Sequence, residues 1–467
     1  MLIPKLDFKT VITEIFDYSN QITGSIEKKR ILKKKKLKEI IRYFEKENPN
    51  THTLIYAGSY EATILIGGTI SSIIPEKKSI LLRRFSEWLM KNYSPDFPLV
   101  QYILKGIGIH NGQLHRSLTQ LQTYLFSDNT LDNNGIHYMI STSSLIQGVN
   151  TSAENIIFWQ RRNGCSNLKS LDYKNLIGRS GRMFQYFIGK VYLLAKPIPD
   201  RITNLELDFS DNIQADIDVD EYNDYLSNNK KEKIKNIQDE FADLLNVSSF
   251  DMVLSENDFK TSNWRDLLNI AHAIYDDKAE WKKMKFLNSV HNNNWRYPIL
   301  TILFNSTVMK KKKIDFNKFS AYIINSSDNW YSPLNQQIKK MYDIGISIDE
   351  YFKFEKYMSY NFSSIVNDIN ILLKYMLPDE HIDISAFSTK LSYAFLPPLV
   401  YYLEEYGLPR TLSKEISDSK IVNFEADIPV SEFLTKLKLI GIDTIISSLK
   451  WEDSFNKEIL EYFFRGI

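Results

Sequence analysis

The chain has 467 residues, of which 43% are hydrophobic and 25% charged. This is the composition of an ordinary globular protein, with enough apolar side chains for one large core or for two to three domains. The net charge of +1 excludes a polycation, so any surface for nucleic acid has to be local. The single cysteine, Cys165, excludes an internal disulfide framework and favours a reducing compartment.

The sequence contains no apolar run of the length that a bilayer-spanning helix needs. Residues 1–9 mix charged and apolar side chains, which is not the pattern of a secretory signal. We therefore expect a cytoplasmic protein without a membrane partner.

Residues 1–50 are predicted to form an interdomain connector and a basic helix. Phe8 to Phe16 is apolar and β-branched enough for a strand, and lysines dominate from Lys28 to Lys38. Helical spacing relates four apolar residues that follow: Leu37, Ile40, Ile41 and Phe44. The favoured interpretation is an amphipathic surface helix with solvated lysines, and the alternative is a helix that faces phosphates.

Residues 51–200 alternate between strand-like and helix-like patterns. The expected strands are Thr53–Ala57, Ile107–Ile109, Ile136–Ile140, Asn155–Trp159 and Val191–Leu194. Helices are expected in the sixties, over Pro98–Lys105 with Gly106 as its C-terminal cap, and over Ser117–Phe126. This alternation predicts an α/β fold with a parallel sheet and helices on both faces.

Three polar residues directly follow expected strands: Ser59, His110 and Thr142. Ligands of such sheets bind at the carboxyl ends of the strands, so we expect these residues on one edge. Arg179 does not follow a strand and would have to reach that edge from the helix before Val191.

The composition changes beyond residue 200. Residues 201–240 are acidic and polar and are predicted to be a linker, whereas residues 241–467 have helical periods and are predicted to be a mostly α-helical accessory domain. Four tryptophans of that part have two interpretations, stacking on unpaired bases or packing in the core, and their leucine-rich surroundings favour the core: Trp264, Trp281, Trp295 and Trp330.

Asn175 to Arg182 reads Asn-Leu-Ile-Gly-Arg-Ser-Gly-Arg, with two arginines three residues apart, each after a glycine. Glycine lets the backbone approach a ligand closely, and the guanidinium fork matches phosphate oxygens. The pattern favours a polyphosphate ligand over a surface arginine pair held by carboxylates.

With three other segments, this stretch resembles superfamily 2 helicases of the superkiller type. Asn175–Arg182 resembles motif VI, Ser141–Asn150 resembles motif V, Gly108–Leu114 resembles the family's His-x-Gly-x-Leu segment, and Thr53–Ser59 resembles motif IV. The segments stand in the family's order. The C-terminal part also resembles bacterial defence helicases of the Hachiman type. The resemblance implies a RecA-like sheet domain at residues 51–200.

The resemblance further implies a nucleotide site. Arg179 and Arg182 would act as arginine fingers on the γ-phosphate of ATP, which would bind with Mg²⁺ between two RecA-like domains. The other residues implied to contact the nucleotide are Gly148, Asn150, Asn175 and Gly178. Asn175 stands where the family usually has glutamine.

A nucleic-acid track is implied as well. Thr142 and Ser143 would hold a backbone phosphate, and Ser59, His110 and Arg116 would lie beside the strand. The alternatives are structural: Ser59 and the serines of motif V as helix N-caps, His110 as a hydrogen-bonding loop residue, and Arg116 as the partner of a carboxylate.

The Gly-x-x-x-x-Gly-Lys-Ser/Thr loop that cradles phosphates does not occur in the sequence. Neither a zinc-ligand pattern nor a hydrolase elbow occurs, so no metal of its own is predicted. We therefore expect the C-terminal half of an ATP-dependent helicase, inactive alone, whose P-loop domain is another polypeptide or is lost. The alternative is a nucleic-acid-binding or scaffold protein that kept the fold without the motor. The expected nucleic-acid partner is DNA or RNA, as a single strand.

Overall fold

The computed structural model describes residues 12–128, 131, 134–144, 153–164, 166–180, 188–199, 215–216, 227–261, 263–289, 291–449 and 455–467. The chain forms two compact units. The first comprises residues 1–203 and 402–467, and the second comprises residues 204–401.

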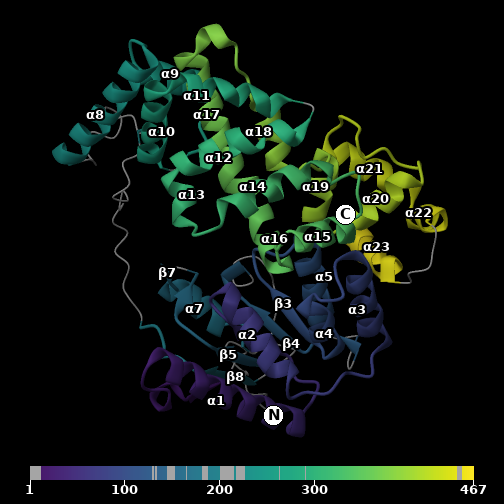
Figure 1. Ribbon diagram of the computed structural model, residues 1–467. Coiled ribbons are helices and arrows are strands. Elements are labelled where there is room, and N and C mark those ends of the chain that lie inside the picture. Colours follow the sequence, from purple (N-terminus) through teal and green to yellow (C-terminus); the bar gives the residue numbers. More distant parts are fainter. Residues whose placement is uncertain are drawn as a thin grey trace, which may run out of the picture. The chain divides into compact units, whose positions relative to one another are not determined.

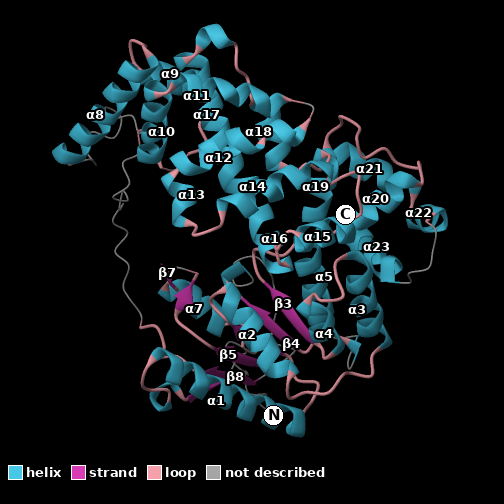
Figure 2. Ribbon diagram, viewed as in Figure 1, coloured by secondary structure: helices cyan, strands magenta, loops and turns pink. Residues whose placement is uncertain are grey.

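A six-stranded parallel sheet is the centre of the first unit. Its strands are β1 (Ile12–Asp17), β2 (Thr53–Tyr56), β3 (Ile107–His110), β4 (Tyr138–Ser141), β5 (Asn155–Phe158) and β8 (Ile188–Leu193). They lie side by side in the order β1-β8-β5-β2-β4-β3, and every neighbouring pair is parallel. The predicted α/β fold with a RecA-like parallel sheet is confirmed, and Figure 2 shows the strands of this sheet among the helices that cover them.

Four strands of the sheet, the inner strands β2, β4 and β5 and the edge strand β3, are fully buried, which explains their continuous apolar runs. Every residue of β2, β3, β4 and β5 is buried, as expected for a sheet with helices on both faces. The helices of this part are α1 (Ile26–Glu47), α2 (Tyr60–Ser71), α3 (Ile80–Asn92), α4 (Pro98–Leu104), α5 (Arg116–Ser127) and α7 (Ser170–Ile177) (Figure 1). Gly106, the predicted cap after α4, has a positive φ of 69°.

The basic helix α1 confirms the amphipathic pattern. Ser25 caps its first turn by accepting a hydrogen bond from the backbone N–H of Lys28. The buried residues of α1 are the four predicted from their spacing: Leu37, Ile40, Ile41 and Phe44.

The last helices of the chain belong to the sheet unit. These are α20 (Arg410–Asp418), α21 (Val430–Ile440), α22 (Ile442–Ser448) and α23 (Phe455–Gly466). Phe455 stacks on Phe85 of α3 with ring centroids 4.8 Å apart, and Trp88 Nε1 donates to Asn456 Oδ1 at 2.8 Å. Residues 402–467 therefore differ from our prediction of one accessory domain over residues 241–467, because they bury aromatic side chains of α3.

In the second unit, all the regular secondary structure of the described residues is helical. Its helices are α8 (Asn228–Leu245), α9 (Phe250–Glu256), α10 (Trp264–Asp276), α11 (Lys278–Trp281), α12 (Arg296–Asn305), α13 (Thr307–Lys311), α14 (Phe316–Asn325), α15 (Leu334–Asp343), α16 (Ile348–Lys356), α17 (Ser363–Met376) and α18 (Ser385–Ser392). Helix α19 (Pro398–Glu405) follows them and leads the chain into residues 402–467.

Helix α8 begins inside the region that we predicted to be a linker, residues 201–240. Ile234, Ile237 and Phe241 recur at helical spacing and are buried, so apolar packing overrides the polar composition around them. The four tryptophans assigned to the core are buried, with 6% or less of each exposed. No described helix combines the length and the apolar character that are needed to cross a membrane.

Candidate nucleic-acid interface at the carboxyl edge of the sheet

The ends of β3 and β4 bring two predicted site residues together. His110, the last residue of β3, pairs with Ser141, the last residue of β4. The next residue, Thr142, donates its backbone N–H to His110 O at 3.1 Å. The register therefore places the motif V hydroxyls beside the His110 loop, as expected for adjacent parallel strands.

Hydroxyl groups and one imidazole form a cluster at this edge. Ser144 Oγ lies 3.1 Å from His110 Nδ1 and 3.2 Å from Thr142 Oγ1. Ser143 Oγ donates to Asn163 Oδ1 at 2.7 Å. Thr142, Ser143 and Ser144 are half-buried, so solvent or a ligand reaches them. Such hydroxyls are suited to phosphate oxygens, which they contact without reading a base.

His110 is a neutral, buried member of this cluster. It is 1% exposed, and burial together with the positive charge of Arg116 lowers the pKa of His110 to about 4. Its Nε2 has no hydrogen-bond partner among the described residues. A ring that stays neutral at physiological pH supplies hydrogen bonds and not charge.

Arg116 supplies positive charge to the same edge. It is the first residue of α5 and is half-buried. Among the described residues no carboxylate forms an ion pair with it, so the predicted alternative of a carboxylate partner is not seen there. Its positive charge helps to lower the pKa of His110.

Ser59 is occupied in a structural role. Its hydroxyl accepts a hydrogen bond from the backbone N–H of Ala62 at 3.3 Å and caps α2. The N-cap interpretation is therefore confirmed, and a contact with nucleic acid would have to use the same hydroxyl or the neighbouring backbone.

A small hairpin, which we did not predict, packs against the end of β2. It pairs β6 (Arg162–Asn163) with β7 (Ser166–Asn167). Gly58 has a φ of +73°, and a Cβ there would lie 2.3 Å from the carbonyl oxygen of Arg162. Gly164 follows β6 directly and has a φ of +59°, and a glycine at the first position of a short loop is the sequence signal for this turn.

Arg179 lies at the other edge of the sheet. Its carbonyl oxygen accepts a hydrogen bond from Ala153 N, and Ala153 precedes the first residue of β5. Because the strands are parallel, the start of β5 and the ends of β3 and β4 are on opposite edges. The backbone of Arg179 therefore does not lie beside Thr142, and the expectation that its side chain reaches the carboxyl edge stays a prediction.

The remaining nucleotide candidates divide into two groups. Asn175 and Gly178 are exposed, on and directly after α7. Gly178 has a φ of −64°, so its backbone needs no glycine for its conformation. The others lie outside the described residues: Gly148, Asn150 and Arg182.

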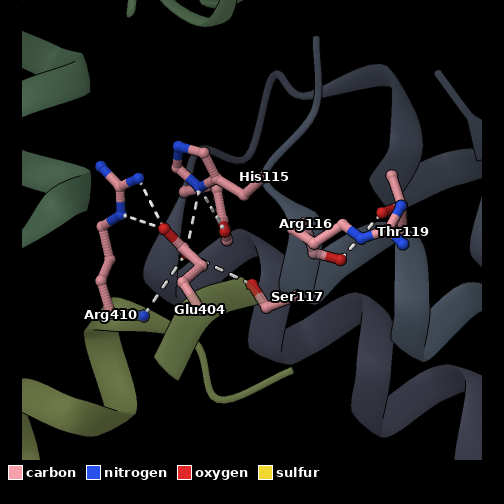
Figure 3. Close-up of polar contacts among 7 residues, drawn as sticks. His115, Arg116, Ser117, Thr119, Glu404 and Arg410 are labelled. Atoms are coloured by element: carbon pink, nitrogen blue, oxygen red, sulfur yellow. Dashed lines mark hydrogen bonds and ion pairs between the residues drawn. The ribbon is translucent and has the colours of Figure 1, made fainter. Parts of the chain in front are cut away.

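A buried ionic cluster ties the loop after β3 to the C-terminal helices (Figure 3). Arg410 donates from Nη2 to Glu404 Oε2 at 2.6 Å, and from Nε to the same oxygen at 2.9 Å. Glu404 Oε1 accepts from Ser117 Oγ at 3.3 Å and lies 3.8 Å from His115 Nδ1. Both ends of the Arg410–Glu404 pair are buried, with 6% and 4% exposed. The pair holds the start of α5, where Arg116 lies.

The sequence signal for this cluster is faint. Glu404 and Arg410 flank the predicted helix corner at residues 406–410, where Gly407 has a φ of +101°. The sequence of that corner does not identify His115 or Ser117 as the partners, because they are almost three hundred residues earlier in the chain.

The described candidate residues fit phosphate contacts better than metal ligation. Among the described residues, no group of three or more His, Cys, Asp or Glu side chains has an arrangement for a metal ion. Arg179, Asn175 and the hydroxyls offer donors to phosphate oxygens, whereas Mg²⁺ prefers carboxylate and phosphate oxygens. An Mg²⁺–ATP complex would therefore need ligands from outside these candidates.

No protein-family model matches the sequence. The chain is similar to Anti-bacteriophage protein B of Escherichia coli (strain K12), with 24% identity over 373 residues, which is 74% of this chain and 50% of that protein. A shorter stretch is similar to DNA polymerase theta of Caenorhabditis elegans, with 31% identity over 108 residues, 23% of this chain and 6% of that protein. The chain thus spans half the length of the first relative and a small part of the second.

Proposed function

We propose that the chain supplies the second RecA-like domain of an ATP-dependent nucleic-acid helicase or translocase that acts in defence against bacteriophage. The observation that carries the proposal is the hydrogen-bonded cluster of His110, Thr142 and Ser144 on adjacent strand ends of a parallel sheet. Two helicase-like segments that are far apart in the sequence supply this cluster. The similarity to Anti-bacteriophage protein B supports the biological setting.

In this proposal the two edges of the sheet have different tasks. Thr142 and Ser143 hold a backbone phosphate of DNA or RNA at the carboxyl edge, and the charge of Arg116 strengthens the contact. Arg179, whose backbone lies at the amino edge, and Arg182 serve the nucleotide. Because a motor must hold ATP while the strand moves, separate surfaces for the two ligands are an advantage.

The nucleotide site is shared with a second polypeptide segment that contains the P-loop. ATP with Mg²⁺, when bound there, supplies the phosphoryl group that is transferred to water. The residues of this chain bind and orient: the arginines stabilise charge on the phosphate oxygens, and Asn175, Gly178, Gly148 and Asn150 contact the nucleotide. We propose no metal site in this chain alone.

Reconstitution tests the proposal. The chain alone is expected to have negligible ATPase activity, and a protein that carries the P-loop domain should restore activity in the presence of single-stranded DNA or RNA. Arg182→Ala should lower the restored rate roughly a thousandfold, because an arginine finger contributes about that much. Arg83→Ala, on the exposed face of α3, is the matched control and should leave the rate unchanged. An unchanged rate for Arg182→Ala removes the finger assignment.

The absence of a P-loop from the sequence favours a second candidate, a nucleic-acid-binding protein without motor function. It predicts binding to single strands that weakens with salt and does not respond to nucleotide. Titrating labelled single-stranded DNA and RNA with and without an ATP analogue separates the two candidates. A nucleotide response that appears only with the P-loop protein excludes the second.

A further inference from the structure

Helix α1 uses some of its lysines to hold the fold. Lys33 Nζ donates to the carbonyl oxygen of Trp159 at 2.5 Å and lies 5.3 Å from the centre of the Trp159 side-chain ring. Burial and the charge of Lys29 lower the pKa of Lys33 to about 8. Lys36 forms an ion pair with Glu39 at 2.6 Å. These lysines are occupied, which distinguishes them from their neighbours on the same helix.

Three other lysines of α1 line a groove against α2. The groove has a volume of about 640 Å³, and Lys34, Lys35 and Lys38 form one wall. The opposite wall contains Ile64, Leu65 and Gly68. Helices α1 and α2 pack side by side here, within the sheet unit (Figure 1). We call this feature the lysine groove.

The charge of the lysine groove has no counterpart in the described part of the protein. No ion pair or hydrogen bond joins Lys34, Lys35 or Lys38 to another described residue, and no Asp or Glu lines the groove. Lys34 and Lys38 are one helical turn apart, a spacing at which like charges destabilise a helix. An anion between them would remove that repulsion.

We propose that the lysine groove binds a single strand of nucleic acid through its phosphate backbone. A single strand presents charged phosphates on one side and the less polar faces of sugars and bases on the other. The groove offers the matching walls, lysines on α1 and apolar side chains on α2. Lysine is a compact point charge that contacts phosphate without demanding one orientation, which suits sequence-independent binding.

The groove is separate from the carboxyl edge. Ser59 marks that edge at the start of α2, and Gly68 is nine residues further along the helix. At 1.5 Å per residue this is roughly 14 Å away. The inference goes beyond the proposed function, because binding here needs neither ATP nor a P-loop domain.

Gly68 provides the sharpest test. A Cβ at Gly68 would meet only Tyr102 Oη, at 3.5 Å, which is an ordinary van der Waals contact, and Gly68 is exposed. Gly68→Glu places a carboxylate among the lysines, whereas Gly68→Gln adds the same bulk without charge. Measured without nucleotide on a labelled oligo(dT) or oligo(U), Gly68→Glu should bind at least about threefold more weakly than Gly68→Gln at low salt. Equal affinities of the two variants overturn the proposal.

A second test counts phosphate contacts. The Kd of the Lys34→Gln/Lys35→Gln/Lys38→Gln variant is measured from about 50 to 200 mM salt, and its salt slope should fall by roughly 2, because each lost phosphate contact on a single strand removes about 0.7. The control, Lys28→Gln/Lys29→Gln/Lys46→Gln, changes the charge of the same helix equally at exposed positions outside the groove. An equal fall in the control overturns the proposal, because net charge alone would then explain it.

Two further probes distinguish other anions. If Gly68→Glu loses binding of labelled poly-glutamate but not of the oligonucleotide, the groove takes an acidic protein segment and the proposal is wrong. If inorganic tripolyphosphate binds the parent protein as tightly as the oligonucleotide and is lost in Gly68→Glu, the ligand is a free polyphosphate and not a strand. All these binding results can be interpreted even if the ATPase reconstitution fails, since none of them uses ATP hydrolysis.

Discussion

His110 makes the stability of the sheet unit depend on pH. In the folded protein the pKa of His110 is about 4, below its ordinary value of 6.5. At a pH between these two values the unfolded chain therefore binds a proton that the folded protein does not bind. The contribution of the neutral His110 ring to the free energy of unfolding is complete above about pH 6.5 and is lost as the pH falls toward 4. Its full size is roughly 3 kcal/mol, from 1.36 kcal/mol per unit of pKa.

We expect His110→Gln to flatten this part of the pH dependence. Urea unfolding from pH 7.5 to 4.5 provides the measurement, and the slope is read rather than the absolute stability, because the substitution also changes local packing. His291→Gln at an exposed position is the control and should keep the parent slope. Equal slopes in the parent and in His110→Gln would contradict the burial argument.

Thr142 is the residue on which we expect a phosphate contact to depend. Thr142→Val removes the hydroxyl and keeps the shape, so it should weaken binding of single-stranded DNA or RNA about three- to tenfold, the worth of one hydrogen bond. Thr142→Ser retains the hydroxyl and should bind as the parent does. Fluorescence anisotropy with labelled oligonucleotides measures both.

Ser144 shows whether Thr142 acts directly. Its hydroxyl joins both Thr142 and His110, so Ser144→Ala disturbs the local network and leaves the Thr142 hydroxyl in place. If Ser144→Ala weakens binding as much as Thr142→Val, the hydroxyl of Thr142 positions the turn and does not contact the strand.

Two adjacent glycines of α2 differ in the space that is available for a side chain. A Cβ at Gly67 would lie 2.7 Å from Cε2 of the buried Tyr102 ring, whereas at Gly68 the nearest atom is 3.5 Å away. Gly67→Ala should therefore destabilise the protein by about 1–3 kcal/mol through overpacking. Gly68→Ala should stabilise it by up to about 1 kcal/mol, because alanine favours helix.

Chemical denaturation of the two alanine variants measures this difference. It also reports on the lysine groove, since Gly68 lines that groove. Equal effects of the two substitutions would mean that Tyr102 does not pack against α2 in the way described.

Among the elements, the hairpin of β6 and β7 and helix α3 were not predicted, whereas the strands of the sheet were. The strands are buried on both faces and stand out as apolar runs with turn residues on either side. The hairpin is short and exposed, and its stability comes from contacts with the end of β2, such as Tyr56 Oη to Arg162 O at 2.8 Å. Local periodicity carries no information on such contacts.

In the whole molecule, the buried pair of Glu404 and Arg410 couples the C-terminal helices to the start of α5 within the sheet unit. Glu404→Ala leaves the buried guanidinium without this carboxylate and should destabilise the unit by about 3–5 kcal/mol. Replacing both residues by apolar ones, Glu404→Leu with Arg410→Met, should recover much of the loss, because no charge then remains buried.

Thermal unfolding and limited proteolysis of residues 402–467 measure this coupling. The single variant should be cleaved in the C-terminal helices at lower temperature than the double variant. A double variant that is no more stable than Glu404→Ala would show that the cluster is needed for its hydrogen bonds to Ser117 and not for charge balance.

The order of strands and helices in the sheet unit, and the polar residues that follow the strands, can be predicted from the amino-acid sequence. Periodicity, caps and turn residues are local properties, and each depends on neighbours within a few positions. The apolar face of α1 is predicted for the same reason. Thr142 and His110 are recognisable because strand ends in a parallel sheet share an edge.

The partners of these elements are settled only when the chain folds. Trp88 meets Asn456 and Ser117 meets Glu404, contacts between residues 368 and 287 positions apart. The backbone of Arg179 lies at the amino edge, where its carbonyl oxygen accepts a hydrogen bond from Ala153 N, and the motif by itself does not indicate this position. Long-range contacts depend on shape and charge complementarity between distant segments, and no pattern within a single segment encodes them.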